Sequence, residues 1–440
     1  MFKLKIISLA FFLSAICFHV ANSQTVTLNN VSSKGFDGVK SIPGKIYYTF
    51  YFGEKSETKG MGNFILELYD MDLKKINTAT IELSKNSKLA GSCFSGQYFL
   101  FVFTDMNDKK LTMVTLDETG KVIQKKEQDD VKRALLSPDN YANLLAADND
   151  EFIVIRPLKE KKLGYAIERM DKDLNTKWSN EFAPEKGEYD ALTSKFSNGK
   201  IFVLRHNKLS AMGNGFENTV FCYDGATGTE VYNYKIYDGE VSGFPSVIDV
   251  DDQGNLFTGG MYFKGTKFDE TNSDGLFFLS LDAKGNKVAY SATPWKTVAD
   301  KIKGDNTSAL FGGKTKVLVE NIIPKKDGSY TIIAETFRKS NNSAMTGGSM
   351  GMLGLASKSP TTSEPHESQI GFTIMDFVLF NFDKSGALAD ITKINKPDKG
   401  IIITGKATEY NGLKLALFMN KSKMFCYRYI LEYNDKQYIV

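Results

Sequence analysis

The chain contains few of the residues from which compact chemical sites are built. Among its 440 residues it has three histidines, four cysteines and two tryptophans. Only His206 and His366 lie beyond the first 23 residues, and this excludes a histidine-based zinc site and a serine–histidine triad. An odd set of three widely spaced cysteines in the same region is not a disulfide framework. The sequence predicts no cofactor, no metal site and no catalytic residues.

Charge and long apolar runs are equally sparse. The net charge of +3 is spread along the chain without a sustained basic block, so no nucleic-acid partner is predicted. After residue 23 no window is long and apolar enough to cross a bilayer, so no transmembrane segment is predicted in the mature chain.

The first residues have the composition of an export signal. Lys3 and Lys5 precede an apolar run from Ile6 to Val20, and the small residues Ala21-Asn22-Ser23 follow it. This order predicts a signal peptide over residues 1–23. The alternative, lipidation at Cys17, requires small residues before the cysteine, whereas Ile16 is bulky. We therefore expect an exported protein, in the periplasm, at the cell surface or outside the cell.

The remaining residues, 24–440, repeat one pattern: an alternating apolar strand, an acidic residue, a turn and a second alternating strand. Period-two apolarity indicates half-buried strands, and Asp or Gly supplies the turn, so each copy predicts a β-hairpin. The seven hairpins centre on Asp70, Asp117, Asp173, Asp224, Asp282, Asp383 and Asn434-Asp435.

A second set of turns alternates with these hairpins, and each of its members precedes a strongly apolar strand. The seven strands are predicted at residues 46–52, 98–103, 152–155, 201–204, 256–263, 330–334 and 413–419. Seven units of four strands predict an all-β, seven-bladed β-propeller forming a single domain over residues 24–440. A pair of β-sandwiches is the alternative, and it does not require a repeated hairpin type.

One copy carries a resemblance to a known repeat. The segment from Tyr223 to Val231, Tyr-Asp-Gly-Ala-Thr-Gly-Thr-Glu-Val, resembles the strand-turn-strand of quinoprotein-type propeller repeats, a style shared by exported bacterial propellers of unknown function. The resemblance implies the fold and no specific chemistry. Trp178 lies at a repeat position and is expected in the core. The segment Thr25 to Leu28 is expected to lie beside the last, truncated copy and close the ring.

Two motifs suggest chemistry but fit structural roles better. Gly347-Gly348-Ser349-Met350-Gly351 matches the nucleophile elbow of hydrolases, yet it lies in a flexible segment rather than between a strand and a helix. Residues 249–254 resemble the start of a calcium loop, but the twelfth position is Gly260 instead of Glu. We interpret them as a loop and a hairpin turn.

Long insertions are predicted on one face of the propeller. They cover residues 263–275, 296–316 and 338–371, and the last is a flexible loop insertion in blade six. Binding residues concentrate on such loops. The candidate binding residues are Trp295, which follows Pro294 in a loop, together with Lys301, Lys303, Met345, Met350 and Met352.

Two function classes remain open. The favoured one is a non-catalytic exported propeller that binds an envelope protein or glycan through these loops. The alternative is an enzyme that acts on a polysaccharide with carboxylates and tyrosines at the central channel. A cluster of such side chains on the inner strands would favour the enzyme.

Overall fold

The computed structural model describes most of the chain beyond residue 38. The described residues are 39–42, 46–70, 72–136, 143–158, 163–209, 215–268, 273–302, 315–325, 327–341, 369–404, 408, 412–421, 424–425, 427, 430–433 and 436–439. The predicted signal peptide, the closing segment Thr25 to Leu28, Lys303 and the three loop methionines lie outside them. No helix among the described residues is long and apolar enough to cross a membrane.

The chain divides into two compact units, which we describe separately. Unit 1 comprises residues 1–139 and 172–174, and it holds two four-stranded antiparallel sheets, each with its strands in chain order. The first sheet contains β1 (Val39–Ile42), β2 (Ile46–Lys55), β3 (Met61–Tyr69) and β4 (Lys75–Ser84). The second contains β5 (Lys88–Phe94), β6 (Tyr98–Asp105), β7 (Lys110–Asp117) and β8 (Val122–Gln128), and the short helix η1 (Arg133–Leu136) follows it.

Unit 2 comprises residues 140–171 and 175–440 and continues the pattern. Its first sheet contains β9 (Leu144–Ala146), β10 (Phe152–Pro157), β11 (Tyr165–Met170) and β12 (Thr176–Phe182). Its second sheet contains β13 (Glu188–Ser197), β14 (Lys200–Lys208), β15 (Phe216–Asp224) and β16 (Glu230–Lys235). The short helix η3 (Asp148–Asp150) joins β9 to β10. The third sheet is β17 (Val241–Val250), β18 (Leu256–Lys264), β19 (Gly275–Leu281), β20 (Lys287–Pro294).

The last large sheet has an additional strand. It contains β21 (Thr315–Pro324), β22 (Tyr330–Asn341), β23 (Gln369–Phe382) and β24 (Leu388–Ile394), while β25 (Lys399–Thr404) pairs with the first half of β23. The helix α2 (Trp295–Lys301) precedes this sheet, and the helix α4 (Gly412–Lys421) follows it. A hairpin of β26 (Ile430–Tyr433) and β27 (Lys436–Ile439) ends the described chain.

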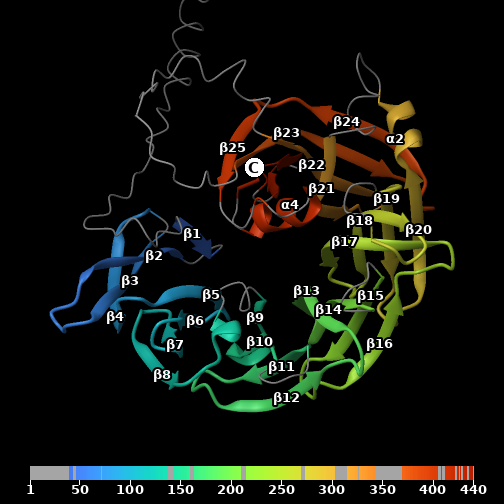
Figure 1. Cartoon of the computed structure of the whole chain (residues 1–440). Helices are drawn as coiled ribbons and strands as arrows, with labels where there is room; N and C mark the ends of the chain where they lie inside the picture. The colour runs from blue at the N-terminus through green and yellow to red at the C-terminus, as the bar shows by residue number, and fades with distance from the viewer. Residues whose placement is uncertain are drawn as a thin grey trace, which may run out of the picture. The chain divides into compact units, whose positions relative to one another are not determined.

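These sheets confirm the all-β fold and its four-stranded repeat, which is the topology of propeller blades. Within unit 2 the first strands β13, β17 and β21 lie next to one another, and Figure 1 shows them on the inner side of the row of sheets. The number of seven blades stays a prediction, because the described residues form five four-stranded sheets, one five-stranded sheet and one two-stranded hairpin. The single-domain prediction is likewise untested.

Aspartates start the turn between the third and fourth strand of all six sheets, as the repeat predicts. The side chain of each accepts hydrogen bonds from backbone amides later in the turn, and in the third sheet the acceptor is Asp171 instead of the predicted centre Asp173. Gly285 shows why glycine follows: its φ is +86°, and a Cβ there would come within 2.5 Å of the Tyr232 ring. Because these contacts lie within single turns, the hairpins can be predicted from the sequence.

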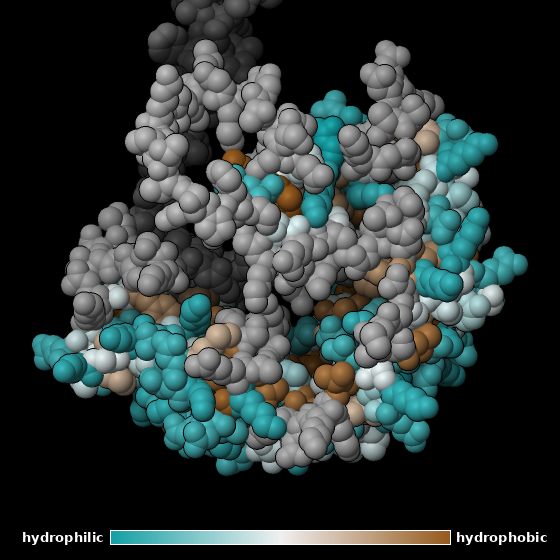
Figure 2. Space-filling view, viewed as in Figure 1, coloured by the Kyte–Doolittle hydropathy of each residue, from teal (hydrophilic) through white to brown (hydrophobic). Residues whose placement is uncertain are grey.

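The fourth strand of each sheet contains a β-bulge. In every one of the six outer hairpins the register skips one residue, and the skipped residues are Ile76, Ile123, Lys177, Val231, Val288 and Ala389. The outer strands are also polar, and Figure 2 shows hydrophilic residues along the edge where β12, β16 and β20 lie.

Two predictions about secondary structure are wrong. The middle strands are buried on both faces instead of half-buried, as in β11 and β19. The strand predicted at residues 413–419 is part of the helix α4. Its alternating leucines fit period two, but Leu415, Ala416 and Met419 are buried at helical spacing, and Leu, Lys, Ala and Met favour a helix.

Candidate functional site

The two predicted binding residues that the structure describes lie at opposite ends of α2. Trp295 begins this helix instead of lying in a loop, packs against two hydrophobic clusters, and donates a hydrogen bond from Nε1 to Ser273 Oγ at 2.9 Å. Lys301 is exposed, and its Nζ lies 3.5 Å from the carbonyl oxygen of Ala389. The Trp295 ring anchors the helix, and the binding role of Trp295 and Lys301 stays a prediction.

A polar cluster on the inner strands of unit 2 is the best-defined group of functional side chains. Lys195 of β13 forms an ion pair with Asp249 of β17, and both side chains are about one third exposed or less. Asn321 of β21 donates a hydrogen bond to the Tyr427 hydroxyl at 2.7 Å. The ion pair connects two consecutive sheets, and the hydrogen bond connects the next sheet to the C-terminal segment. We call Lys195, Asp249, Glu320, Asn321, Glu335, Lys396, Asn420 and Tyr427 the inner-strand cluster.

A β-bulge explains how β21 contributes two consecutive residues to this cluster. The register with β22 shifts between Val319 and Asn321, so that Glu320 is the extra residue. In a regular strand neighbouring side chains point to opposite faces. Here Glu320 accepts a hydrogen bond from Asn420, while Asn321 contacts Tyr427, so both reach the same C-terminal segment.

The buried end of the inner-strand cluster is a charged pair. Glu335 of β22 is fully buried, its Oε2 lies 3.1 Å from Lys396 Nζ, and its Oε1 accepts a hydrogen bond from the backbone amide of Tyr427. A buried carboxylate needs such partners, because an uncompensated charge in the interior is costly. Glu335 therefore fixes the position of Tyr427, which lies in the C-terminal segment after α4.

Two carboxylates of the inner-strand cluster are paired with lysines, and its phenol is neutral. Burial raises the pKa of Tyr427, and the negative charges of Glu320 and Asp249 add to this rise, so its phenol stays neutral at physiological pH. Asp249 and Glu335 are each paired with a lysine. Glycosidases use one carboxyl group as an acid and a second as a base or nucleophile. Paired carboxylates and a neutral phenol are better suited to hold polar groups by hydrogen bonds.

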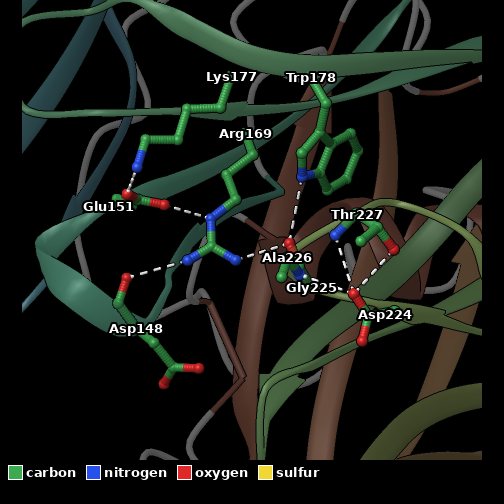
Figure 3. Close-up of polar contacts among 9 residues, drawn as sticks. All are labelled: Asp148, Glu151, Arg169, Lys177, Trp178, Asp224, Gly225, Ala226 and Thr227. Atoms are coloured by element: carbon green, nitrogen blue, oxygen red, sulfur yellow. Dashed lines mark hydrogen bonds and ion pairs between the residues drawn. The ribbon is translucent and has the colours of Figure 1, made fainter.

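A second polar cluster joins the first two sheets of unit 2. Arg169, almost fully buried, forms an ion pair with Glu151 and donates hydrogen bonds to the carbonyl oxygens of Gly225 at 2.6 Å and Asp148 at 3.2 Å. Figure 3 shows Lys177 on the other side of Glu151 and Trp178 Nε1 pointing at the same Gly225 oxygen. Each charged group has a partner, so we assign this cluster to structure, in agreement with the predicted core position of Trp178.

Neither cluster has a metal-site pattern. Within the part of the chain that the structure describes, no group of three His, Cys, Asp or Glu side chains is arranged to hold a metal ion. The segment that resembles a calcium loop is the turn between β17 and β18, as predicted, where Asp251 accepts hydrogen bonds from the amides of Gln253 and Asn255.

The sequence analysis did not identify the residues of the inner-strand cluster. They come from β13, β17, β21, β22 and the C-terminal segment, so no local spacing marks them. A signal exists only at Glu320-Asn321, two polar residues in succession within an apolar strand.

Comparisons with known proteins place the chain in a family and describe fold similarity. The model of a family described as "Family of unknown function (DUF6770)" matches residues 3–440. No curated protein matches the sequence significantly.

Solved structures with a similar fold share little sequence with this chain. Quinohemoprotein alcohol dehydrogenase from Comamonas testosteroni has 12% identity and a TM-score of 0.43, covering 83% of this chain and 62% of that chain. A putative dipeptidyl aminopeptidase IV from Bacteroides ovatus has 9% identity and a TM-score of 0.39, covering 72% and 47%. The WD40 domain of Toxoplasma gondii coronin has 11% identity and a TM-score of 0.32, covering 67% and 65%. The chain thus spans less than two thirds of each, and these similarities carry no argument about activity.

Proposed function

We propose, since the chain belongs to this family of unknown function (DUF6770), that it is an exported, non-catalytic, seven-bladed β-propeller that binds an envelope protein or glycan through loops on one face. In this proposal residues 1–23 are a removed signal peptide. The loop insertion predicted at residues 338–371 lies in the sixth blade between β22 and β23, and residues 338–341 and 369–371 belong to these strands. The protein then acts in the periplasm, at the cell surface or outside the cell.

One topological observation supports the binding face. In an antiparallel sheet with strands in chain order, the connection between the second and third strands and the connections to neighbouring sheets lie at the same end of the strands. Three connections therefore lie at the same strand ends of two consecutive sheets: those between β18 and β19, between β20 and β21, and between β22 and β23. Those before β21 and before β23 are the longest connections between strands of these two sheets. Long connections on a rigid scaffold are typical of binding surfaces.

A deletion tests this proposal. Removing residues 343–366 keeps the described ends of β22 and β23, and the matched control is K384A in the short turn at the opposite edge. Affinity purification of the tagged mature chain from native envelope should yield a partner with wild type and K384A but not with the deletion variant. A partner that the deletion variant retains would contradict a binding role for this loop.

The inner-strand cluster supports one alternative, an enzyme that acts on a polysaccharide. Carboxylates and a tyrosine do gather on the inner strands, with Asp249 partly exposed beside Lys195. The test is release of reducing ends from envelope polysaccharides by wild type, Y427F and D249N, with K384A as the control. Turnover that falls at least about a hundredfold in D249N would favour the enzyme. Absence of turnover with every polysaccharide that binds would favour the non-catalytic role.

A further inference from the structure

Arg205 of β14 lies between two aromatic rings. Its guanidinium carbon is 4.1 Å from the ring centroid of Tyr189, on β13, and 3.9 Å from that of Phe221, on β15. Cation–π contacts at these distances stabilise a guanidinium group at its faces. They leave the edge of the group, where its N–H donors lie, for other partners.

Among the described residues the Arg205 guanidinium interacts with the Tyr165 hydroxyl, but no carboxylate faces it. Arg205 Nε is buried without a hydrogen-bond partner, and no described carboxylate forms an ion pair with this side chain. Buried guanidinium groups are normally matched by carboxylates or carbonyl oxygens, as Arg169 is in the same pair of sheets. An arginine that is held rigidly and lacks a carboxylate partner is the unusual feature.

Two tyrosines add further donors next to Arg205. The side chains of Tyr165, on β11, and Tyr223, on β15, are almost fully buried, and neither hydroxyl meets a partner at hydrogen-bond geometry among the described residues. Burial raises the pKa of Tyr165 to about 12, and the charge of Arg205, together with side-chain interactions with Tyr223 and Arg205, opposes the rise. Burial and Tyr165 raise the pKa of Tyr223 as well. Both hydroxyls therefore keep their protons at neutral pH.

We propose that Arg205, Tyr165 and Tyr223 form a binding site for one oxyanion group, a carboxylate or a sulfate. Such a group accepts two parallel hydrogen bonds from the edge of a guanidinium, which is the geometry that the covering rings leave open. Tyrosine hydroxyls donate to the same oxygens. Binding would supply the acceptor that these buried donors lack.

The position of the site makes it reachable. Tyr165 is the first residue of β11 and Arg205 lies in the second half of β14, so both are toward the edge from which the second-to-third-strand connections leave. Tyr223 is the eighth of the nine residues of β15, toward the opposite end of the strands. Arg205 itself is partly exposed. The inference uses none of the residues of the inner-strand cluster and none of the loop at 343–366, and it stands independently of the proposed function.

Thermal unfolding with anions tests the site in the full mature chain. We compare sodium sulfate and sodium glucuronate with sodium chloride at equal ionic strength, in wild type, R205Q and the neighbouring surface variant K208Q. Sulfate also stabilises proteins generally, so the difference between wild type and R205Q is the informative quantity. The Tm of wild type and K208Q should rise by about 2 °C or more beyond that of R205Q. The two anions separate a sulfated from a carboxylated ligand.

Affinity measurements provide the second criterion. Calorimetric titration with the anion that gives the larger rise should show an affinity at least about tenfold lower in R205Q, with R205K between the two, because lysine keeps the charge but lacks the planar fork. If R205Q does not fold, Y165F, which removes only a hydroxyl, should weaken binding about threefold or more. An anion effect that is equal in wild type and R205Q, or absent in wild type, would overturn the proposal.

Discussion

Two arginines in the pair of sheets β9–β12 and β13–β16, Arg169 and Arg205, have opposite surroundings. Arg169 has a carboxylate and two carbonyl oxygens around it, whereas Arg205 has two aromatic rings and two tyrosine hydroxyls. The surroundings of Arg169 provide acceptors for each nitrogen of its guanidinium, whereas the rings around Arg205 only fix the position of its guanidinium. The difference separates a group that holds the fold together from a group prepared for a ligand.

The largest expected difference between Arg169 and Arg205 is in their contributions to the free energy of unfolding. Replacing Arg169 by Met leaves Glu151 buried with Lys177 as its remaining cation, and we expect the free energy of unfolding to fall by about 3–5 kcal/mol. R205M removes no ion pair, so its loss should stay within about 1 kcal/mol. Urea unfolding of both variants measures this. A double variant, E151L with R169M, should regain part of the loss, and equal losses in R169M and R205M would contradict the comparison.

A smaller difference is expected at the neighbouring side chains. Trp178 donates a hydrogen bond to the Gly225 carbonyl, so W178F should lower the free energy of unfolding by about 1–2 kcal/mol. The Tyr165 hydroxyl has no such bond, so Y165F should be neutral or slightly stabilising in the absence of anions. Both variants can be measured by urea unfolding in chloride buffer. A Y165F loss as large as that of W178F would show that this hydroxyl is already satisfied.

The smallest difference concerns acid stability. The Thr227 hydroxyl and backbone amides, together with the charge of Arg169, lower the pKa of Asp224. Because the folded-state pKa lies below the unfolded value of about 4, this stabilisation is complete above that value and is lost as pH falls through the folded-state pKa. We expect D224N, which keeps an acceptor oxygen, to lose slightly less Tm than wild type between about pH 5 and pH 2.

The R205Q variant is the control for this pH series. It should lose Tm in parallel with wild type, because no described carboxylate pairs with Arg205. A D224N curve parallel to that of wild type would remove Asp224 from the account of acid stability.

The sequence revealed the repeat because its signals are local. An aspartate that accepts amides two to four residues later, and a glycine with positive φ, are properties of single hairpins such as that of Asp282 and Gly285. The strand predicted at residues 413–419 failed because alternating leucines also fit one face of a helix when the partner is unknown. The local sequence pattern therefore predicted the hairpins but did not predict the helix α4.

The candidate sites were not predictable in the same way. Tyr189, Arg205 and Phe221 belong to three strands, and only their pairing brings the rings to the guanidinium. Trp295 begins a helix instead of lying in a loop, and the sequence does not show the partners of its indole, which are Ser273 and two hydrophobic clusters. Lys303, Met345, Met350 and Met352 stay predictions, since they lie outside the described residues.

The bulge shared by the six outer hairpins also bears on how copies of this protein avoid one another. A fourth strand is the free edge of its sheet, and a regular free edge can accept a strand from another molecule. A skipped residue interrupts the ladder of hydrogen-bonding groups at that edge and increases its twist, and Lys177 adds charge at one such position. A sequence that repeats a sheet many times also repeats its exposed edges, and here the same repeat carries a bulge at each of the six described edges.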